Sequence, residues 1–274
     1  MEQYTRLSYK TAKATTLDYS TSFSQSSKLF SKDIRHHIYA IYGLVRVADE
    51  VVDTYKGKDA ARVIKDLEAE TMRALKTGFS PNPLVHAFAT TARRYSIGRD
   101  LIRPFFKSMR MDLKPKTFNK NLYCIYIYGS AEVIGLMCLK IFCDDKQQYE
   151  QLRSGAEALG SAYQKVNFLR DMKSDYEERG RVYFPDIQFE KFNDRQKDIL
   201  IKEMKKDFEK AKPAIENLPK NARAAVAVSY VYYSKLLSKL EKTPAEKIKA
   251  GRVRVNNVTK LALFTKTRLK QGRI

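Results

Sequence analysis

The segment that decides the fold reads Gln164-Lys165-Val166-Asn167-Phe168-Leu169-Arg170-Asp171-Met172-Lys173-Ser174-Asp175. In a helix, residues three and four positions apart are neighbours, so four polar side chains of this segment share one face. These are Gln164, Asn167, Asp171 and Asp175. Apolar side chains fill half of the other positions, which is typical of a buried helix: Val166, Phe168, Leu169 and Met172. Two buried carboxylates need a compensating charge, and Mg²⁺ suits them because it binds carboxylate and phosphate oxygens.

An earlier segment, from Tyr39 to Asp53, repeats this pattern. Helical spacing aligns four polar side chains along one face of a largely apolar helix. These are Tyr42, Arg46, Asp49 and Asp53. A single pair of acids four residues apart occurs by chance on solvated helices. Two such pairs on apolar helices, each with an arginine nearby, predict one cavity with carboxylates on two of its walls.

The chain of 274 residues carries a formal net charge of +21. Such a charge predicts an anionic partner, which is nucleic acid, an acidic membrane surface or a phosphorylated substrate. No acidic residue follows Glu246, whereas many basic residues do. They are Lys247, Lys249, Arg252, Arg254, Lys260, Lys266, Arg268, Lys270 and Arg273. This basic tail, from about residue 247, is either a solvated end of the chain or a segment that contacts an anionic membrane.

The cysteines and histidines form no disulfide or metal-binding pattern. The cysteines, Cys124, Cys138 and Cys143, are odd in number and loosely spaced. The histidines do not cluster with them, and His36-His37 is expected to be an ordinary surface pair on a helix. No signal peptide is recognisable at the N-terminus, so the cytoplasm is the expected location, with peripheral contact at the inner face of the membrane as an extension.

The hydrophobic pattern predicts helices along the whole chain and no alternating strand. The expected helices span 1–18, 32–54, 58–78, 83–97, 99–111, 119–143, 146–178, 193–218, 220–241 and from about 243 onward. Residues 1–274 are therefore expected to form a single all-α domain, a helical bundle around a central cavity. Segment 119–143 approaches the length of a transmembrane helix, but Glu132 and its glycines favour a buried core helix. The Ser/Thr-rich run 19–27 is interpreted as a capped loop, with a phosphate cradle as the alternative.

Several motifs, in order along nearly the whole chain, resemble the squalene/phytoene synthase family, the head-to-head trans-prenyltransferases. The motifs are Tyr19-Ser20-Thr21-Ser22-Phe23; Tyr42, Arg46, Asp49 and Asp53; Tyr126 to Gly135; Gln164, Asn167, Arg170, Asp171 and Asp175; Arg179 to Pro185; and Tyr233. The resemblance implies the fold of the isoprenoid synthases and a reaction between two prenyl diphosphates. The chain departs from the family at Glu132, where many members have glycine, and at Tyr19, where histidine is frequent.

The resemblance also implies roles for these residues. Mg²⁺, or Mn²⁺, is expected to be held by Asp49, Asp53, Asn167, Asp171 and Asp175. The expected catalytic residues are the four aspartates, Arg46 and Tyr126. The expected substrate-binding residues are Tyr19, Ser20, Thr21, Ser22, Phe23, Tyr42, Gln164, Arg170 and Tyr233. The cations and arginines would neutralise the departing diphosphate, while apolar walls keep water from the carbocation.

The expected reaction joins two geranylgeranyl diphosphates through a cyclopropyl (prephytoene) diphosphate to phytoene and diphosphate, in carotenoid biosynthesis. No G-x-G-x-x-G motif follows a strand, so no NADPH is expected. The alternatives within the family are dehydrosqualene, squalene and hydroxysqualene synthases, which use farnesyl diphosphate. Gly129, Ser130, Ala131 and Gly135 are small and leave room for a long tail. Replacing Ala131 by Phe or Leu is expected to favour the shorter C15 substrate.

Two hypotheses from other classes are less favoured. A catalytically inactive helical assembly or binding protein has no need to retain both aspartate pairs. A basic helical nucleic-acid-binding protein leaves the buried acids unexplained, so no nucleic-acid partner is expected. The sequence leaves the oligomeric state open.

Overall fold

The computed structural model describes residues 1–55, 57–114, 117–269 and 274, with the backbone alone for Thr21, Ser22, Asn257, Leu261, Lys266, Arg268 and Leu269. The helices are α1 (Glu2–Tyr19), α2 (Thr21–Ser27), α3 (Lys32–Asp49), η1 (Glu50–Thr54), α4 (Ala60–Thr77), α5 (Pro83–Arg94), α6 (Arg99–Met111), α7 (Lys120–Ile127), η2 (Tyr128–Glu132), α8 (Val133–Phe142), α9 (Lys146–Arg170), α10 (Met172–Arg179), η3 (Phe189–Lys191), α11 (Asp194–Glu216), α12 (Lys220–Lys242), α13 (Ala245–Ala250) and α14 (Asn257–Leu269). In these parts of the chain, the remaining regular structure is one isolated bridge between Thr117 and Val182. The all-α prediction is confirmed.

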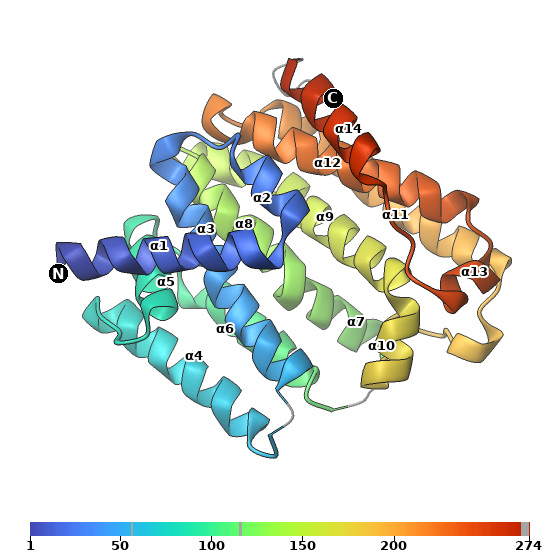
Figure 1. Ribbon diagram of the computed structural model, residues 1–274, viewed down its shortest axis with the longest axis horizontal. Coiled ribbons are helices and arrows are strands. Elements are labelled where there is room, and N and C mark those ends of the chain that lie inside the picture. The colour runs from blue at the N-terminus through green and yellow to red at the C-terminus, as the bar shows by residue number, and fades with distance from the viewer. Residues whose placement is uncertain (56, 115–116, 270–273) are drawn as a thin grey trace.

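The long helix α9 lies in the middle of the bundle (Figure 1). It packs against α8 and η2, and also against α11 and α12. Its first half contributes Leu152 and Ala158 to one buried apolar cluster, and its second half contributes Val166 and Leu169 to another. Helix α9 therefore joins the two halves of the core, and the polar segment 164–175 spans its C-terminal end and the start of α10.

The Ser/Thr-rich run after α1 is a short helix, so its interpretation as a loop is wrong. Ser20 has an extended backbone and caps α2, because its Oγ accepts a hydrogen bond from the N–H of Phe23 at 3.2 Å. A serine cap of this kind stabilises a helix start by about 1 kcal/mol. The cap reverses the chain direction between α1 and α2, which pack against each other.

His37 is buried, so the prediction of a surface pair at His36-His37 is wrong there. His37 is 1% exposed, and its Nδ1 lies 2.9 Å from Oγ1 of Thr91 and 3.1 Å from the hydroxyl of Tyr9. Burial lowers the pKa of His37 to about 3, so the ring is neutral. Its role is structural, because it ties α3 to α1 and α5.

Two helices contain a π-helical turn at a candidate site motif. In η1, which continues α3, the N–H of Tyr55 donates to the carbonyl oxygen of Glu50 at 2.9 Å, a spacing of five residues. The turn η2 joins α7 to α8. A π turn holds more residues than an α-helical turn, so it changes the direction in which the following side chains point, and such turns are frequent at functional sites.

The helix from Lys120 to Phe142, made of α7, η2 and α8, is long and apolar enough to cross a membrane, with 23 residues and a mean hydropathy of 1.6. A core helix of a soluble protein meets the same criteria of length and composition. Here the helix packs against α3, α6 and α9. This packing accounts for its apolar composition.

The C-terminal region is not one helix, so the prediction of a single helix from about residue 243 is wrong. Helices α13 and α14 are separated by residues 251–256, here called the C-terminal strap. Val253 and Val255 of the strap are 8% and 6% exposed. Helix α14 then packs on α12 (Figure 1). The strap therefore lies against the bundle.

Candidate active site

A cavity of about 1090 Å³ lies between α2, α3, α8, α9, α12 and the C-terminal strap. Its lining on α9 runs from Leu152 to Arg170, about 27 Å along the helix axis. The lining near Arg170 is polar and includes Tyr19, Ser20, Gln164, Asn167, Arg170, Tyr232, Tyr233, Arg252, Arg254, Asn256 and Lys260. The lining near Leu152 is apolar and includes Phe30, Ile38, Cys138, Leu139, Phe142, Leu152, Ile215, Leu218 and Ala225. The cavity exceeds the roughly 300–1,000 Å³ of a typical small-molecule site.

Contacts between three segments surround the apolar end of the cavity. The N–H of Ser31 donates to the carbonyl oxygen of Asn221 at 2.9 Å, and Nδ2 of Asn221 donates to that of Phe142 at 3.2 Å. The rings of Phe30 and Phe142 are stacked, with centroids 5.4 Å apart. The cavity therefore has a charged end and an apolar end, and the three segments around the apolar end are joined by hydrogen bonds and ring stacking.

The small residues of η2 and α8 have two different functions. Ser130, Ala131 and Gly135 line the cavity, as the sequence predicts. Gly129 faces α6 instead, because a Cβ on it would lie 2.2 Å from the carbonyl oxygen of Pro104. Gly129 therefore allows η2 to approach α6 closely and adds no room for a tail, which corrects the prediction at this position.

Most of the predicted substrate-binding residues line the cavity. They are Tyr19, Ser20, Phe23, Tyr42, Gln164, Arg170 and Tyr233, together with the predicted metal ligand Asn167. The backbone of Thr21 and Ser22 belongs to α2, and their side chains lie outside the described residues. The rings of Phe23 and Tyr42 are stacked at 5.2 Å, and the hydroxyl of Tyr233 donates to Oδ1 of Asn167 at 3.2 Å. Residues from α1, α2, α3, α9 and α12 therefore converge on this end.

Arg46 lies at the outer side of the same end. Its guanidinium stands over the ring of Tyr19, 4.3 Å from the centroid, and pairs with Glu50 one turn further along the helix. Tyr19 is 52% exposed. Arg46 and Tyr19 therefore form part of the rim between the cavity and solvent.

The second aspartate motif keeps its helical register across a helix boundary. Helix α9 ends at Arg170 and α10 begins at Met172, with Asp171 between them. The N–H of Asp171 still donates to the carbonyl of Asn167 at 2.9 Å, and that of Asp175 donates to the carbonyl of Asp171 at 3.0 Å. The predicted polar face is therefore present, although the helix is not continuous.

The carboxyl groups of the two aspartate motifs repel one another. Burial, and then repulsion from Asp53, raise the pKa of Asp49 to about 8. Burial, and then repulsion from Asp171, raise the pKa of Asp175 to about 7, and Asp53 adds to this effect. Since Asp53 disfavours the ionised form of a carboxyl on both motifs, the two motifs form one acidic cluster. The four aspartates are absent from the described lining of the cavity, so the cluster lies beside the cavity and not on two of its walls. Such a cluster fits a divalent cation, because full ionisation requires added positive charge.

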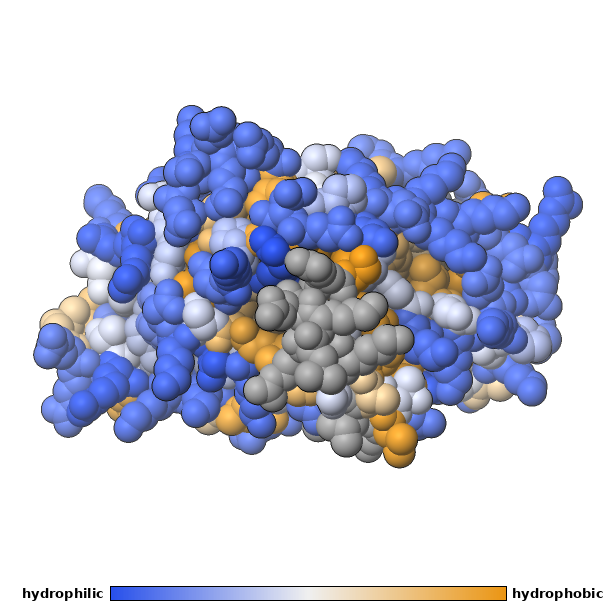
Figure 2. Space-filling view, turned by 90° about the horizontal axis from the view of Figure 1, so that it is seen from above, coloured by the Kyte–Doolittle hydropathy of each residue, from blue (hydrophilic) through white to orange (hydrophobic). Residues whose placement is uncertain are grey.

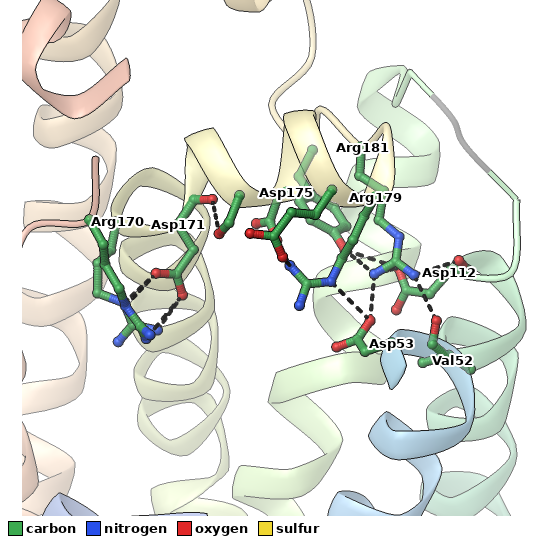
Figure 3. A network of polar contacts seen from close by, with 12 residues as sticks. Val52, Asp53, Asp112, Arg170, Asp171, Asp175, Arg179 and Arg181 are labelled. Atoms are coloured by element: carbon green, nitrogen blue, oxygen red, sulfur yellow. Dashed lines mark hydrogen bonds and ion pairs between the residues drawn. The ribbon is translucent and has the colours of Figure 1, made fainter. Parts of the chain in front are cut away.

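Arginines pair with this cluster in the structure (Figure 3). Asp171 accepts hydrogen bonds from Arg170 Nε at 3.0 Å and lies 2.8 Å from Arg252 Nε. Arg179 lies 3.3 Å from Asp175 and 3.6 Å from Asp53. Among the described residues, no three Asp, Glu, His or Cys side chains converge on one point as metal ligands do. The predicted metal ligands carry the carboxylate oxygens that Mg²⁺ prefers. In this structure Asp53, Asp171 and Asp175 pair with guanidinium groups instead.

A buried polar network lies behind Asp53. Asp112, which is 7% exposed, accepts hydrogen bonds from the hydroxyls of Tyr126 at 2.6 Å and Tyr183 at 3.0 Å. Burial raises the pKa of Asp112 to about 6, although Arg181 lowers it. Arg181 donates to Asp53 at 2.7 Å (Figure 3). Tyr126 is thus part of this network and is absent from the described lining of the cavity, so the structure places this predicted catalytic residue behind Asp53.

Sequence reasoning missed two groups of residues at the site. The strap residues Arg252, Arg254 and Asn256 line the cavity, and Arg252 pairs with Asp171. Asp112 and Arg181 also carry no role in the sequence analysis. The sequence analysis places Arg252 only in the basic tail, as a solvated or membrane-contacting residue. No spacing rule connects Asp112 to Asp53, because they come from different helices.

Glu132, which stands where many family members have glycine, points away from the cavity. It is absent from the described cavity lining. Burial and the nearby Glu157 and Asp207 raise its pKa to about 7, while Lys165 and Lys210 lower it. Glu132 therefore faces α9 and α11, and it neither narrows nor polarises the cavity.

Glu132 predicts a pH dependence of stability. Its carboxyl has a folded pKa of about 7 against 4.5 as the ordinary value, so between these values the folded state binds more protons than the unfolded state. The free energy of unfolding therefore falls as pH rises from about 5 to 7. Glu132→Gln is expected to flatten this decline in thermal melts, while Glu150→Gln on the surface leaves it unchanged. An equal slope in Glu132→Gln and the wild type would contradict this assignment.

Comparisons with known proteins identify the family to which this chain belongs. Residues 17–259 match the squalene/phytoene synthase family. Phytoene synthase 2 of Solanum lycopersicum is 29% identical over 246 residues, which cover 82% of this chain and 78% of that protein. Phytoene synthase 1 of Arabidopsis thaliana is 28% identical over 243 residues, which cover 82% of this chain and 57% of that protein. Against several such plant relatives, the chain thus spans less than two thirds of their length.

Solved structures show the same fold. A dehydrosqualene synthase in complex with a ligand superposes with a TM-score of 0.79 at 20% identity, covering 98% of both chains. A squalene synthase from Alicyclobacillus acidocaldarius superposes with a TM-score of 0.76 at 18% identity, covering 91% of this chain and 97% of that one. The fold, the site motifs and the sequence match over residues 17–259 lead to one conclusion: the chain belongs to the squalene/phytoene synthase family of prenyltransferases.

Proposed function

We propose that this protein condenses two molecules of geranylgeranyl diphosphate, through a cyclopropyl (prephytoene) diphosphate, to phytoene and diphosphate. The observation that supports it is the cavity of about 1090 Å³, whose cationic end continues into an apolar pocket. Arg170 and Arg252 of the cationic end pair with Asp171 of the acidic cluster. A substrate with a diphosphate head and a long apolar tail matches both ends. Relatives of this chain are named phytoene synthases, and this supports the proposal of a C20 substrate. We also propose that residues 1–274 act as one domain.

The residues of the acidic cluster fit Mg²⁺. Asp49, Asp53, Asn167, Asp171 and Asp175 would supply the oxygen ligands, with the arginine partners released to other anions. Bound there, Mg²⁺ or Mn²⁺ would act as a Lewis acid that stabilises the negative charge of the leaving diphosphate. The raised pKa values of Asp49 and Asp175 imply that cation binding releases protons, so affinity rises with pH toward 8.

The chain's own cations would bind the diphosphates. Arg170, Arg252 and Lys260 line the polar end of the cavity, and Arg46 lies at its rim. Guanidinium groups bind phosphate oxygens in a bidentate way, and those that face Asp171 in the free protein can turn to the substrate. The departing diphosphate thereby meets fixed positive charge, which lowers the barrier to ionisation.

The apolar walls would protect the carbocation. Phe23, Ile134, Leu139 and Leu159 line the cavity beyond its polar end, and water excluded by such walls cannot quench the cation. The stacked rings of Tyr163 and Tyr233, 4.0 Å apart, lie where the polar and apolar parts meet. Aromatic faces there stabilise positive charge by cation–π interaction. Loss of a proton then ends the reaction without a reductant.

The decisive experiment incubates purified protein with geranylgeranyl or farnesyl diphosphate and Mg²⁺, with and without NADPH. Chromatography and mass spectrometry are expected to identify phytoene from the C20 substrate, independent of NADPH. A C30 hydrocarbon or alcohol as the main product would assign a dehydrosqualene, squalene or hydroxysqualene synthase instead. The absence of any condensation product would favour a catalytically inactive binding protein.

We also propose peripheral contact with an anionic membrane from the cytoplasmic side. Basic residues of α1 and its surroundings line an open groove of about 1170 Å³: Arg6, Lys10, Lys13, Lys28 and Lys32. Figure 2 shows a largely hydrophilic face with apolar residues gathered near its middle. In the basic tail, Arg252 pairs with Asp171 and Lys249 with Glu246, while the side chains of Lys266, Arg268, Lys270 and Arg273 lie outside the described residues.

Vesicle binding tests this membrane contact. Each Lys or Arg near an anionic surface contributes about 1 kcal/mol, which salt screens. Co-sedimentation with anionic vesicles is expected to fall steeply as salt rises, and to be weakened by the double charge reversal of Lys10 and Lys13 to Glu. Reversal of Lys202 on α11 serves as the matched control. Equal binding to neutral vesicles would refute the electrostatic contact.

A further inference from the structure

We propose that Asp112 is a positioning residue that holds Arg181 and, through it, orients the carboxylate of Asp53 toward the cation site. This inference rests on the proposed function only in that Asp53 is taken as a ligand of a divalent cation. Asp112 itself belongs to no aspartate motif of the sequence. It comes from the end of α6, a helix that contributes no residue to the described cavity lining.

Asp112 is held by a complete set of donors. Its Oδ2 accepts from the hydroxyl of Tyr126 at 2.6 Å, and its Oδ1 accepts from that of Tyr183 at 3.0 Å. Its carboxylate also lies 3.7 Å from Nη1 of Arg181. All three partners are buried, with exposures of 3%, 6% and 6%. A buried carboxylate is costly unless it is paired and hydrogen-bonded, so this geometry is strongly fixed.

Arg181 connects the fixed carboxylate of Asp112 to the carboxylate of Asp53. Its Nη1 donates to Oδ1 of Asp53 at 2.7 Å, and its Nη2 donates to the backbone carbonyls of Val52 at 3.1 Å and Asp112 at 2.6 Å. One guanidinium therefore joins the π turn η1, the end of α6 and the segment after α10 (Figure 3). Because the planar fork binds three acceptors at once, it has little freedom to rotate.

The charge of Asp112 also limits how strongly Arg181 competes with a cation for Asp53. Arg181 now shares its positive charge between the carboxylates of Asp112 and Asp53. With Asn at position 112, Arg181 would lose one of its two carboxylate partners and would interact more strongly with Asp53. The side chain at position 112 would also lose one of its two acceptor oxygens, leaving a Tyr hydroxyl without its partner. Both effects weaken cation binding, and groups that support a metal ligand typically change metal affinity about 10–100-fold.

The test is a titration of the purified protein with Mn²⁺ in the presence of inorganic diphosphate, with free Mn²⁺ measured by electron paramagnetic resonance. Asp112→Asn is expected to raise the Kd for Mn²⁺ about 10–100-fold relative to the wild type. Asp59→Asn is the matched control, since Asp59 also accepts from a Tyr hydroxyl and an Arg, at 2.7 Å each, but lies on the surface. Its Kd is expected to equal that of the wild type.

A second control separates positioning from general loss of stability. Met204→Ala removes a core side chain that is 0% exposed, so it lowers the melting temperature of the metal-free protein without changing the Kd at a temperature where it is folded. If Asp112→Asn does not fold, Tyr126→Phe takes its place and is expected to raise the Kd severalfold. A wild-type protein that binds Mn²⁺ together with an Asp112→Asn variant of equal Kd overturns this inference alone. No binding by the wild type overturns the proposed cation site, and this inference with it.

Discussion

Replacing Asp49 with asparagine is expected to lower turnover by several orders of magnitude while it stabilises the metal-free protein at pH 8. The loss of turnover follows because a carboxylate that holds the cation is replaced by a neutral amide, so the leaving diphosphate loses Lewis-acid stabilisation. Asp49 lies one helical turn after Arg46 and faces Asp53. It therefore belongs to the densest part of the acidic cluster.

The gain in stability follows from the pKa of Asp49. Burial and Asp53 raise this pKa from 3.8 to about 8 in the folded protein. Between these two values the folded state binds more protons than the unfolded state, so the free energy of unfolding falls as pH rises through this window. Asparagine does not ionise and avoids that loss. The advantage of the variant is expected to be largest above pH 8 and absent below pH 4.

Two measurements check this prediction. Steady-state assays with saturating Mg²⁺ report turnover, and thermal melts in a chelator between pH 5 and 9 report stability. Asp66→Asn, an exposed aspartate on α4, is the matched control and is expected to change neither. Wild-type turnover in Asp49→Asn would remove Asp49 from the site, and a parallel pH profile would contradict its raised pKa.

Filling the apolar end of the cavity is expected to change the product from C40 to C30. Cys138 lines this end, whereas Ala131 lies two helical turns nearer to the polar end, beside Gly160. A ring at position 138 would occupy the space of the last isoprene unit. At about 0.8 kcal/mol for each buried methylene, excluding five carbons costs up to about 4 kcal/mol, about a thousandfold in preference. Cys138→Phe is therefore expected to prefer farnesyl diphosphate.

The comparison with Ala131→Phe makes the test directional. Gly160 lies seven residues before Asn167 on α9, about 10 Å along the helix, so a ring opposite it would obstruct tails of both lengths. We therefore expect Ala131→Phe to lower turnover with both substrates, which replaces the expectation from the sequence alone, whereas the smaller Ala131→Leu keeps the shift toward C15. Cys124→Phe, at an exposed cysteine, is the control. An unchanged ratio of C20 to C15 turnover in Cys138→Phe would show that the tail does not reach this end.

The sequence predicts the helices well because their apolar faces are long and periodic. The bounds of α1, α4, α6 and α12 differ from expectation by at most two residues. It fails where the local pattern is ambiguous. Serine-rich residues 19–27 lack an apolar period, and the helix there depends on the cap at Ser20 and on packing of α2 against α1 and α12. His37 carries no sequence mark of burial, since its partners Tyr9 and Thr91 come from distant helices.

The sequence likewise identifies some residues of the candidate site and misses others. Spacing along one helix identifies the pairs Asp49 and Asp53, and Asp171 and Asp175. It does not identify Asp112, because that residue meets Asp53 only through Arg181 and only after α6 packs in the bundle. The direction of Glu132 is likewise a property of the π turn η2, which residue periodicity in an α-helix does not describe.

The π turn η1 makes the first aspartate motif sensitive to chain length as well as to residue type. A one-residue deletion between Asp49 and Asp53 would convert the turn to an ordinary α-helical one and shorten the spacing of the two aspartates from four residues to three. Asp49 precedes the turn and would keep its place, whereas the direction of Asp53 toward Arg181 would change. An alignment gap placed within this turn therefore marks relatives in which the pair has a different geometry.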